Sequence, residues 1–430
     1  MNESSEPILL SFEAHRRAMK GLPPVVPPQA EPTPPVPRYR YTRKRWHTLM
    51  GLIDGLGERL FNLFPQAKQP VEPPRRILLI QLDHLGDAML TTPMLGALRW
   101  HYPDAEIEVL ASESCAEVFQ RHADVKQVWV CRRNRLSRSV RTGWMGAMLY
   151  WGLKLRRQKY DLAFDVRGEL PHALLMWLSG AKRRIGWAAG GGGFLLSDSV
   201  AYLPGRHETD SRMALLECAD IPTNQYPGGQ TPVFEPSWSA MHRMATRVHS
   251  FTWKEEVLFV LHIGAGSAAK RWPVPNWREL VRRLRSEYKA RVILVGSHDD
   301  QEQAKRITRW AENARVVNWT GQTTLEELAA LVRMSDVFIG CDSGPAHVAA
   351  AGGTPSVVLF SGTNDAEQWR PWGPHVSVLK HEVACSPCHT QDCPVTGHPC
   401  MTDLRPSDVM QAVHQHLATH HTATRRAVAA

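Results

Sequence analysis

The amino-acid sequence predicts an α/β protein in which two successive units each hold a parallel β-sheet with helices on both faces. From residue 76 onward, apolar runs of strand length alternate with helix-like stretches, which is typical of parallel sheets. This rhythm breaks once, around residues 222–240, where "PTNQYPGGQTPVFEPSW" is rich in proline and glycine, and then restarts. We therefore expect two α/β domains that face each other across a cleft.

Each predicted strand is a short apolar run that ends at a polar or glycine-rich turn. The first unit contains "ILLIQL", "AEIEVLAS", "QVWVC" and "DLAFDV". The second unit contains "EVLFVLHIGAG", "ARVILVGSHDD", "ARVVNWTG", "DVFIGCDSG" and "PSVVLFSG". Strands without polar alternation are expected where helices cover both faces of a sheet.

Length and charge narrow the class of protein. The chain has 430 residues, 43% of them apolar, and a formal net charge of +9. It is long enough for two domains with extra segments, and its positive charge favours anionic partners. The start, "MNESSEPILLSFEAHRR", carries early acidic residues and no long apolar core, so we expect neither a signal peptide nor a spanning helix. The expected location is the cytoplasm, where the eight cysteines are reduced thiols or ligands.

The residues before the first strand have a composition of their own. Residues 1–37 include "LPPVVPPQAEPTPPVP" and are predicted to be disordered. Residues 38–74 are predicted to hold a basic amphipathic helix and a linker. The apolar residues of this helix recur at helical spacing: Trp46, Leu49, Met50, Ile53, Leu56, Leu60 and Phe64. Such a helix lies at a lipid headgroup boundary or packs on the protein itself; the adjoining run "RYRYTRKRW" favours the membrane.

The polar clusters of the chain lie at the carboxyl ends of predicted strands, where open parallel sheets bind their ligands. The turn "QLDHLGD" holds one glycine instead of the spaced glycines of a dinucleotide fingerprint, and no Walker loop occurs in the sequence. Nicotinamide-dependent redox chemistry and P-loop phosphoryl transfer are therefore disfavoured.

Two loops of the second unit are suited to a diphosphate. In "FIGCDSGPAHVAAAGG", Ser343 is expected to cap a helix whose free amides and positive end attract phosphate, and His347 is expected to add a donor. In "LHIGAGSAAKRWPVPNW", Gly264 and Ser267 permit close backbone approach, and Lys270 supplies a positive charge. The alternative for the first loop is an ordinary capped connection between a strand and a helix. The alternative for the second loop is a solvated basic loop.

Taken together, these motifs resemble a known family. "ILLIQLDHLGDAMLTTPML", "HIGAGSAAKRWPVPNW", "FIGCDSGPAHVAAAGGTPSVVLFSGT" and "QWRPWG" are similar to the motifs of glycosyltransferase family 9, the heptosyltransferases that build the lipopolysaccharide inner core from ADP-heptose. The likeness spans Arg75 to Val413 and includes "YDLAFDVRG" followed by "LLMWLSGAKRRIGW". The family pattern has glutamine where this chain has Arg167, and it lacks the N-terminal extension.

The resemblance implies a GT-B fold of two Rossmann-like domains. We expect an acceptor domain over residues 75–235, a nucleotide-sugar domain over 236–415 and a flexible tail over 416–430. It also implies that Asp87 is the general base that takes a proton from the acceptor hydroxyl. A helix start is expected to lower the pKa of Asp87 and keep it ionised. A helix cap is the alternative role for this residue.

The resemblance assigns the donor side as well. Lys270, with the amides near Ser343 and Gly344, is expected to neutralise the departing diphosphate. Further nucleotide-sugar contacts are expected from Asp342 to a sugar hydroxyl, from Thr363 to a phosphate or the sugar, and from His262 and Asp299 to the nucleotide. The resemblance further implies inversion at the anomeric carbon, with neither a catalytic metal nor a cofactor.

Two features bear on the acceptor and on the cysteines. Between Val125 and Tyr160 there are ten Lys or Arg and no Asp or Glu. Such a run is a solvated face or a site for an anionic glycolipid, and we assign acceptor contacts to Arg132, Arg133, Arg135 and Arg167. The cysteines of "CSPCHTQDCPVTGHPC" form zinc ligands, disulfides or plain thiols, and the spacing does not decide among them.

The sequence therefore predicts an enzyme that moves a heptose or similar sugar from a nucleoside-diphosphate sugar to an anionic lipid-linked oligosaccharide at the cytoplasmic membrane surface. No nucleic-acid partner is expected. The alternatives are a transferase of the same fold that acts on another surface glycan, and a catalytically silent nucleotide-sugar-binding protein held at the membrane by residues 38–64.

Overall fold

The computed structural model describes residues 38–39, 44–62, 73–131, 144–250, 257–309 and 315–428. The chain divides into two compact units, Met1–Arg38 and Tyr39–Ala430, and the description below concerns the second. The segment predicted to be disordered, 1–37, lies outside the described residues, as do Arg132, Arg133 and Arg135.

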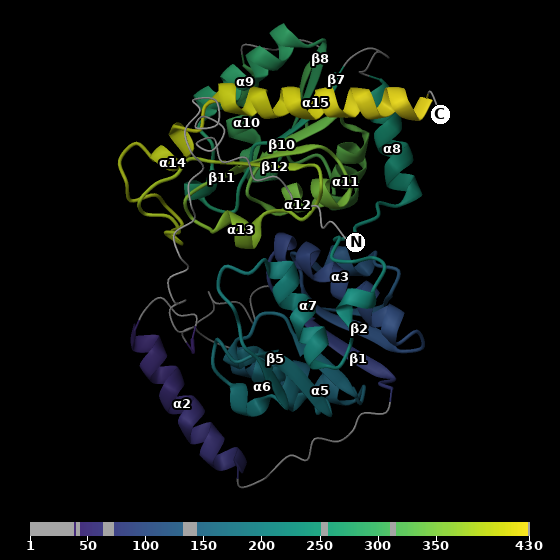
Figure 1. Ribbon diagram of the computed structural model, residues 1–430, viewed down its shortest axis with the longest axis vertical. Coiled ribbons are helices and arrows are strands. Elements are labelled where there is room, and N and C mark those ends of the chain that lie inside the picture. The colour runs from purple at the N-terminus through teal and green to yellow at the C-terminus, as the bar shows by residue number, and fades with distance from the viewer. Residues whose placement is uncertain are drawn as a thin grey trace, which may run out of the picture. The chain divides into compact units, whose positions relative to one another are not determined.

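The first sheet has six strands, all parallel, in the order β3-β2-β1-β4-β5-β6. Their bounds are β1 (Arg76–Gln81), β2 (Glu106–Ser112), β3 (Val125–Cys131), β4 (Leu162–Asp165), β5 (Arg183–Trp187) and β6 (Asp198–Val200). The helices connected to it are α3 (Leu85–His101), α4 (Ala116–Gln120), α5 (Trp144–Arg156), α6 (Leu170–Leu178) and α7 (Glu208–Cys218). Consecutive buried positions in β1 and β2 match the prediction that both faces of the sheet are covered (Figure 1).

The second sheet repeats this topology, with six parallel strands in the order β12-β11-β10-β7-β8-β9. Its strands are β7 (Val257–His262), β8 (Ala290–Val295), β9 (Val316–Asn318), β10 (Val337–Cys341), β11 (Ser356–Phe360) and β12 (Val376–Lys380). The helices that follow the first sheet in the chain are α8 (Trp238–His249), α9 (Val274–Glu287), α10 (Gln301–Thr308), α11 (Leu325–Met334), α12 (Gly344–Ala351), α13 (Ala366–Trp369), α14 (Pro399–Thr402) and α15 (Pro406–Val428). The predicted fold class, two Rossmann-like domains with parallel sheets, is confirmed.

Three strands had no signal in the sequence pattern. β5 begins with two arginines, β6 has three residues, and the edge strand β12 is only partly buried along its length. These strands lack the continuous apolar run that revealed the others. At the other end of the chain, α15 makes residues 416–428 helical where we predicted a flexible tail. The boundary between the two domains at residue 235 stays a prediction.

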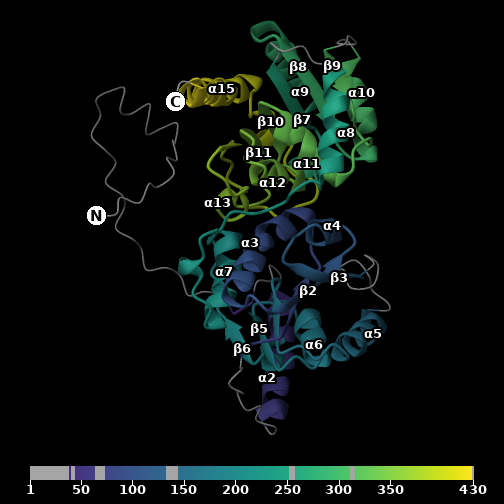
Figure 2. The same ribbon diagram turned by 90° about the vertical axis from the view of Figure 1, so that its right-hand side faces the viewer.

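The two domains meet where α3 and α12 begin (Figure 2). A Cβ on Gly344 would lie 2.7 Å from the Leu85 side chain, and a Cβ on Gly86 would lie 3.1 Å from the His347 ring. Both glycines therefore permit a close approach that larger residues would block. This contact brings the first turn of one helix to the first turn of the other.

The helix α2 (Lys44–Asn62) packs on the first domain through one face. Asp54 is buried there, where it accepts hydrogen bonds from the Tyr39 hydroxyl at 2.8 Å and from the Gly192 N–H at 2.7 Å. The Phe61 ring lies 5.3 Å from that of Phe194. Packing on the protein, one of the two predicted alternatives, therefore holds for this face.

The domain covers only part of the apolar residues that we predicted for α2. Met50 is buried against the domain, whereas Leu49, Leu56 and Leu60 are exposed together with Leu52. The face of α2 that contacts the domain carries the buried Asp54 and Met50, and the leucines lie outside this contact. Phe64 lies outside the described residues. In the described part of the chain, no helix combines the length and apolarity that crossing a bilayer requires.

Candidate active site

The strand order places one switch point in each sheet. The chain leaves β1 toward β2 on one side, and β4 lies on the other side of β1; β7, with neighbours β8 and β10, repeats this arrangement. Crevices form at the carboxyl ends of such strand pairs because the following connections diverge. Asp83 and Asp87 follow β1, and Asp342 follows β10, so the polar clusters predicted from the sequence stand at these two points.

Asp87 lies in the first turn of α3, and its side chain is 13% exposed. Its Oδ1 is 3.2 Å from Nη2 of Arg212, which lies on α7. Its Oδ2 is 4.0 Å from Nδ1 of His84. His84 precedes α3 without capping it. The sequence near Asp87 lacks a basic partner of this kind, so the fold brings Arg212 from 125 residues further along the chain.

The expectation that the helix start lowers the pKa of Asp87 is wrong. Burial raises the pKa of this carboxyl to about 7, and the negative charges of Asp83 and Glu208 add to the rise, while Arg212 and His84 oppose it. Desolvation disfavours the charged form and outweighs the helix dipole here. A carboxyl with a pKa near 7 is well matched to accept a proton at neutral pH.

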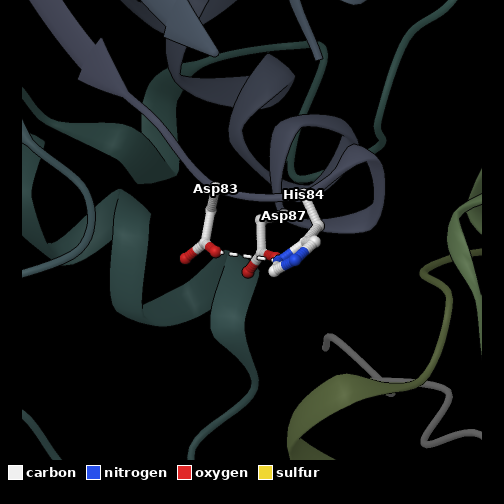
Figure 3. Close-up of side chains that lie close together, drawn as sticks. All are labelled: Asp83, His84 and Asp87. Carbon is white, nitrogen blue, oxygen red and sulfur yellow. Dashed lines mark hydrogen bonds and ion pairs between the residues drawn. The ribbon is translucent and has the colours of Figure 1, made fainter. Parts of the chain in front are cut away.

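Asp83 differs from Asp87 although the two lie four residues apart. Its Oδ1 is 2.6 Å from Nη1 of Arg167. The same oxygen is 3.0 Å from Nδ1 of His84 (Figure 3). Burial alone would raise the pKa of Asp83, but the hydrogen bond from His84 and the charge of Arg167 hold it well below its usual range. The hydrogen bond to Asp83 in turn raises the pKa of His84. The turn therefore carries one firmly ionised carboxylate beside one that titrates near neutral pH.

The ligand atoms of Asp83, His84 and Asp87 lie within 4.8 Å of one another, a spacing that a metal ion could use. Guanidinium groups already occupy both carboxylates, Arg167 on Asp83 and Arg212 on Asp87. These fixed cations compete with a metal for the same oxygens, so the residues fit a metal poorly.

On the donor side, Lys270 and Asp342 form an ion pair. Lys270 ends the short 3-10 helix η3 (Ala268–Lys270), and its Nζ lies 2.6 Å from Oδ2 of Asp342. The same oxygen accepts from Nδ2 of Asn364 at 3.0 Å. The Lys270 side chain keeps partial exposure, so its ammonium has access to an anionic ligand beside Asp342.

No side chain caps the start of α12 in the described residues. Ser343 occupies the N-cap position, but the expectation that it caps the helix is wrong. Its hydroxyl instead donates to the Cys341 carbonyl at 3.1 Å and lies 3.3 Å from Nδ1 of His262. The serine side chain therefore does not occupy the Gly344 amide, the first of α12. Pro345 has no N–H, and the Ala346 amide donates to the Ser343 carbonyl at 3.0 Å, so the Gly344 amide is the one that suits a phosphate oxygen.

His347 lies between the two halves of the site. Its ring packs against Gly86 of α3. The charges of Asp342 and Lys270 in the second domain and of Arg212 in the first domain interact electrostatically with the ring. Burial lowers its pKa to about 4, so the ring is neutral at pH 7. The imidazole therefore fills the interface between the first turns of α3 and α12.

The other predicted nucleotide contacts differ in their placement. His262 is buried at the end of β7, and burial lowers its pKa to about 4. Asp299 is exposed, whereas its neighbour Asp300 is buried, fills the space beside Gly264 and pairs with Nη2 of Arg271 at 2.9 Å. The Ser267 hydroxyl is buried and makes no hydrogen bond within the described residues. It stands three residues before Lys270, where a phosphate oxygen would satisfy it.

Thr363 is buried in the loop after β11, and the cysteine segment braces that loop. The amide of Cys388 donates to the Gly362 carbonyl at 2.8 Å, and that of His389 donates to the Thr363 carbonyl at 3.1 Å. The four cysteines of this segment, Cys385, Cys388, Cys393 and Cys400, are free thiols in this structure. Burial raises the pKa of Cys400, and the nearby Cys393, Cys385 and Cys388 add to the rise. The segment therefore supports the loop that carries Thr363 and Asn364.

Several residues of the site were missed. Asp83 and His84 stand in the quoted motif "QLDHLGD", and Asp300 directly follows Asp299, so their polarity at a strand end was a usable signal. Arg212 and Glu208 lie on a helix more than 100 residues from Asp87 and carried no such signal. Arg167 reaches the site, but its guanidinium already lies on Asp83 and 3.0 Å from Glu169.

The chain is similar to known heptosyltransferases. Lipopolysaccharide heptosyltransferase 3 of Escherichia coli is 27% identical over 300 residues, which are 67% of this chain and 82% of that protein. Lipooligosaccharide heptosyltransferase 2 of Campylobacter jejuni is 29% identical over 335 residues, 76% of this chain and 95% of that protein. The structure of Escherichia coli ADP-heptose lipopolysaccharide heptosyltransferase II, at 23% identity, covers 80% of this chain and 99% of its own with a TM-score of 0.65, which shows the same GT-B fold.

The family model for glycosyltransferase family 9 (heptosyltransferase) matches residues 149–398, more than half of the chain. With paired Rossmann-like domains and polar residues at both switch points, this chain belongs to glycosyltransferase family 9, a family of heptosyltransferases.

Proposed function

We propose that this protein transfers a heptose from ADP-heptose to a lipopolysaccharide core acceptor with inversion at the anomeric carbon. The observation that carries the proposal is the meeting of two helix starts, α3 with Asp87 and α12 beside the Lys270–Asp342 pair. A base and a diphosphate site that face each other across this contact are what a single displacement needs.

In the proposed reaction, Asp87 accepts the proton of the acceptor hydroxyl while the hydroxyl oxygen forms its bond to the anomeric carbon. The bond from that carbon to the diphosphate oxygen breaks, and ADP leaves with the electron pair. Lys270 and the Gly344 amide at the start of α12 stabilise the negative charge that develops on the diphosphate. The Ser267 hydroxyl contacts a phosphate oxygen, Asp342 accepts from a sugar hydroxyl, and His262 lies near the nucleotide.

The test is turnover with purified protein, ADP-heptose and a truncated lipid acceptor, measured as ADP release. We expect Asp87→Asn to abolish turnover while ADP binding, measured by calorimetry, is unchanged. Unchanged turnover in Asp87→Asn would exclude Asp87 as the base. Turnover only with other nucleotide sugars or other glycans would support a different surface-glycan transferase, and ADP-heptose binding without turnover would support a silent binding protein.

The acceptor and the location belong to the same proposal. An anionic lipid-linked acceptor would place its phosphates near Arg167, which shares its charge with Asp83 and Glu169. We place the protein at the inner surface of the cytoplasmic membrane, held by α2. The outer face of α2 carries four exposed leucines, Leu49, Leu52, Leu56 and Leu60.

The surroundings of α2 extend this apolar surface. Of the fourteen exposed large apolar side chains in the described residues, nine lie on α2, α5 and α6. The Phe61 ring lies 5.9 Å from the ring of Trp177 on α6, and Gly152 of α5 packs on Leu178 of the same helix. Arg45 and Arg59 flank the leucines, so the surface suits anionic lipid.

Vesicle co-sedimentation tests this location without donor or acceptor. We expect the protein to sediment with vesicles that contain phosphatidylglycerol, and Leu52→Glu with Leu56→Glu to reduce the bound fraction about tenfold or more. Leu203→Glu, another exposed leucine, is the matched control. A protein that forms dimers through these leucines and ignores the vesicles would refute the membrane location.

A further inference from the structure

A buried chain of polar contacts runs from Asp87 into α7. Arg212 is 2% exposed, and its two terminal nitrogens hold different carboxylates. Nη2 lies 3.2 Å from Oδ1 of Asp87, and Nη1 lies 2.8 Å from Oε2 of Glu208. Because a buried guanidinium is costly unless carboxylates pair with it, the placement of Arg212 depends on both partners.

Glu208 continues the chain into the second domain. Its Oε1 accepts from Nε2 of Gln368 at 2.8 Å and from the Tyr202 hydroxyl. Gln368 lies on α13, four residues after the Asn364 that donates to Asp342. The segment 361–370 therefore touches the Lys270–Asp342 pair at one end and the Arg212–Glu208 pair at the other.

A second contact fixes the same segment beside α7. The ring nitrogen Nε2 of His207 lies 2.9 Å from the carbonyl oxygen of Arg370. Burial lowers the pKa of His207, so the ring is neutral at pH 7 and Nε2 donates to that carbonyl. The start of α7 is thus joined to residues 361–370 by two hydrogen bonds, one at Glu208 and one at His207.

We propose that Arg212 is a positioning residue for Asp87, and that the contact between Glu208 and Gln368 makes this positioning depend on segment 361–370. A nucleotide sugar that binds at Lys270 and Asp342 meets Asn364 at the other end of that segment. Donor binding in one domain is thereby coupled to the orientation and charge of the base in the other. The inference rests on the proposed role of Asp87 as the base.

The charges that face Asp87 come from every element packed against it. They are Asp83 and His84 in the preceding turn, Arg167 after β4, Arg212 and Glu208 on α7, with His347 of α12 under the adjacent Gly86. Arg212 favours the ionised form of Asp87, whereas Glu208 disfavours it. Removal of the two charges therefore shifts the titration of Asp87 in opposite directions.

The test compares Glu208→Gln and Arg212→Met by the pH dependence of turnover. We expect Glu208→Gln to move the acidic limb of the profile to lower pH, and Arg212→Met to move it to higher pH, each by about one unit. Arg212→Lys keeps the charge but not the paired geometry, so it should retain the wild-type limb with a lower kcat. Arg183→Met, which removes a cation paired with Asp198 at the amino end of β5, is the matched control and should leave the limb unchanged.

Gln368→Leu tests the link between the domains. We expect it to lower kcat several-fold while the Kd for ADP stays within a factor of two, because the side chain contacts Glu208 and Tyr202. Gln322→Leu removes a contact of the same kind to Arg247 on the second domain and should leave kcat unchanged. Equal kcat values in wild type and Gln368→Leu would overturn the coupling.

Unfolding midpoints as a function of pH give a second readout that needs no turnover. Opposite shifts in Glu208→Gln and Arg212→Met that vanish when Asp87 is also Asn would support the proposal, even if the chain proved inactive and the proposed function failed. If both variants lower stability equally at every pH, and neither moves the limb, Arg212 is only structural and the proposal fails.

Discussion

Replacing Asp87 by Asn should make the protein inactive but more stable. The carboxyl has a pKa of about 7 in the folded chain against an ordinary value of 3.8. A group with a raised pKa binds its proton more tightly in the folded state than in the unfolded state. Its stabilising contribution is therefore complete below about pH 4 and is lost as the pH rises through about 7.

The magnitude follows from this difference. A gap of about 3 pH units, at about 1.4 kcal/mol each, corresponds to about 4 kcal/mol of unfolding free energy. An asparagine has no charge to desolvate, so Asp87→Asn should raise the free energy of unfolding by up to about 4 kcal/mol at pH 8 and by almost nothing at pH 4.

Urea unfolding at pH 8, 6 and 4 measures this gain. Asp161→Asn is the control of opposite sign, because the bond from Lys182 and the amides of Arg75 and Arg76 lower the pKa of Asp161 against the effect of its burial. That variant should lose stability at pH 8. A pH-independent effect of Asp87→Asn, or a loss of stability at pH 8, would refute the account of the Asp87 environment.

Three further predictions concern turnover and packing. In wild type, kcat/KM should rise with pH to a plateau with a midpoint near 7, because the base must be ionised and the pKa of Asp87 is about 7; a flat profile between about pH 5.5 and 8.5 would contradict this. Lys270→Met should lower kcat by about 10²–10³ and weaken ADP binding less, since the charge of Lys270 is needed most as the diphosphate departs. Steady-state ADP release measures this, and a kcat within a factor of two of wild type would exclude the proposed role of Lys270. Gly344→Val should destabilise the contact between α3 and α12 by about 1–3 kcal/mol in thermal unfolding, since even a Cβ would lie 2.7 Å from Leu85. Leu85→Ala in the same chain should recover part of this loss of stability. Gly146→Val, where a Cβ meets nothing within 4 Å, should not show the loss.

The positions of Asp87 and Asp342 could be predicted because they follow from local pattern alone. Each lies just beyond an apolar run of strand length, and parallel strands place their carboxyl ends at one edge. The two α/β units with parallel sheets were predicted from the alternation of apolar runs and helix-like stretches, although β5, β6 and β12 lack continuous apolar character. The resemblance of the motifs to a family supplied the roles that a pattern cannot.

The partners of these residues could not be predicted in the same way. Arg212 reaches Asp87 across 125 positions, and Asp300 rather than Asp299 turns inward beside Gly264. The pKa of Asp87 is raised instead of lowered because the carboxyl is buried. A sequence reveals the helix start that lowers a pKa but not the burial that raises it.

The sequence by itself determined where the strands end and that Asp87, Asp342 and Lys270 follow them. Periodicity and turn chemistry depend only on residues close together in the chain, so a sequence shows them directly. Only the tertiary structure decided the charge state of Asp87, which face of α2 packs on the domain, and the chain of contacts from Arg212 to Gln368. These properties depend on desolvation and on contacts between distant segments, and both arise only when the chain has folded.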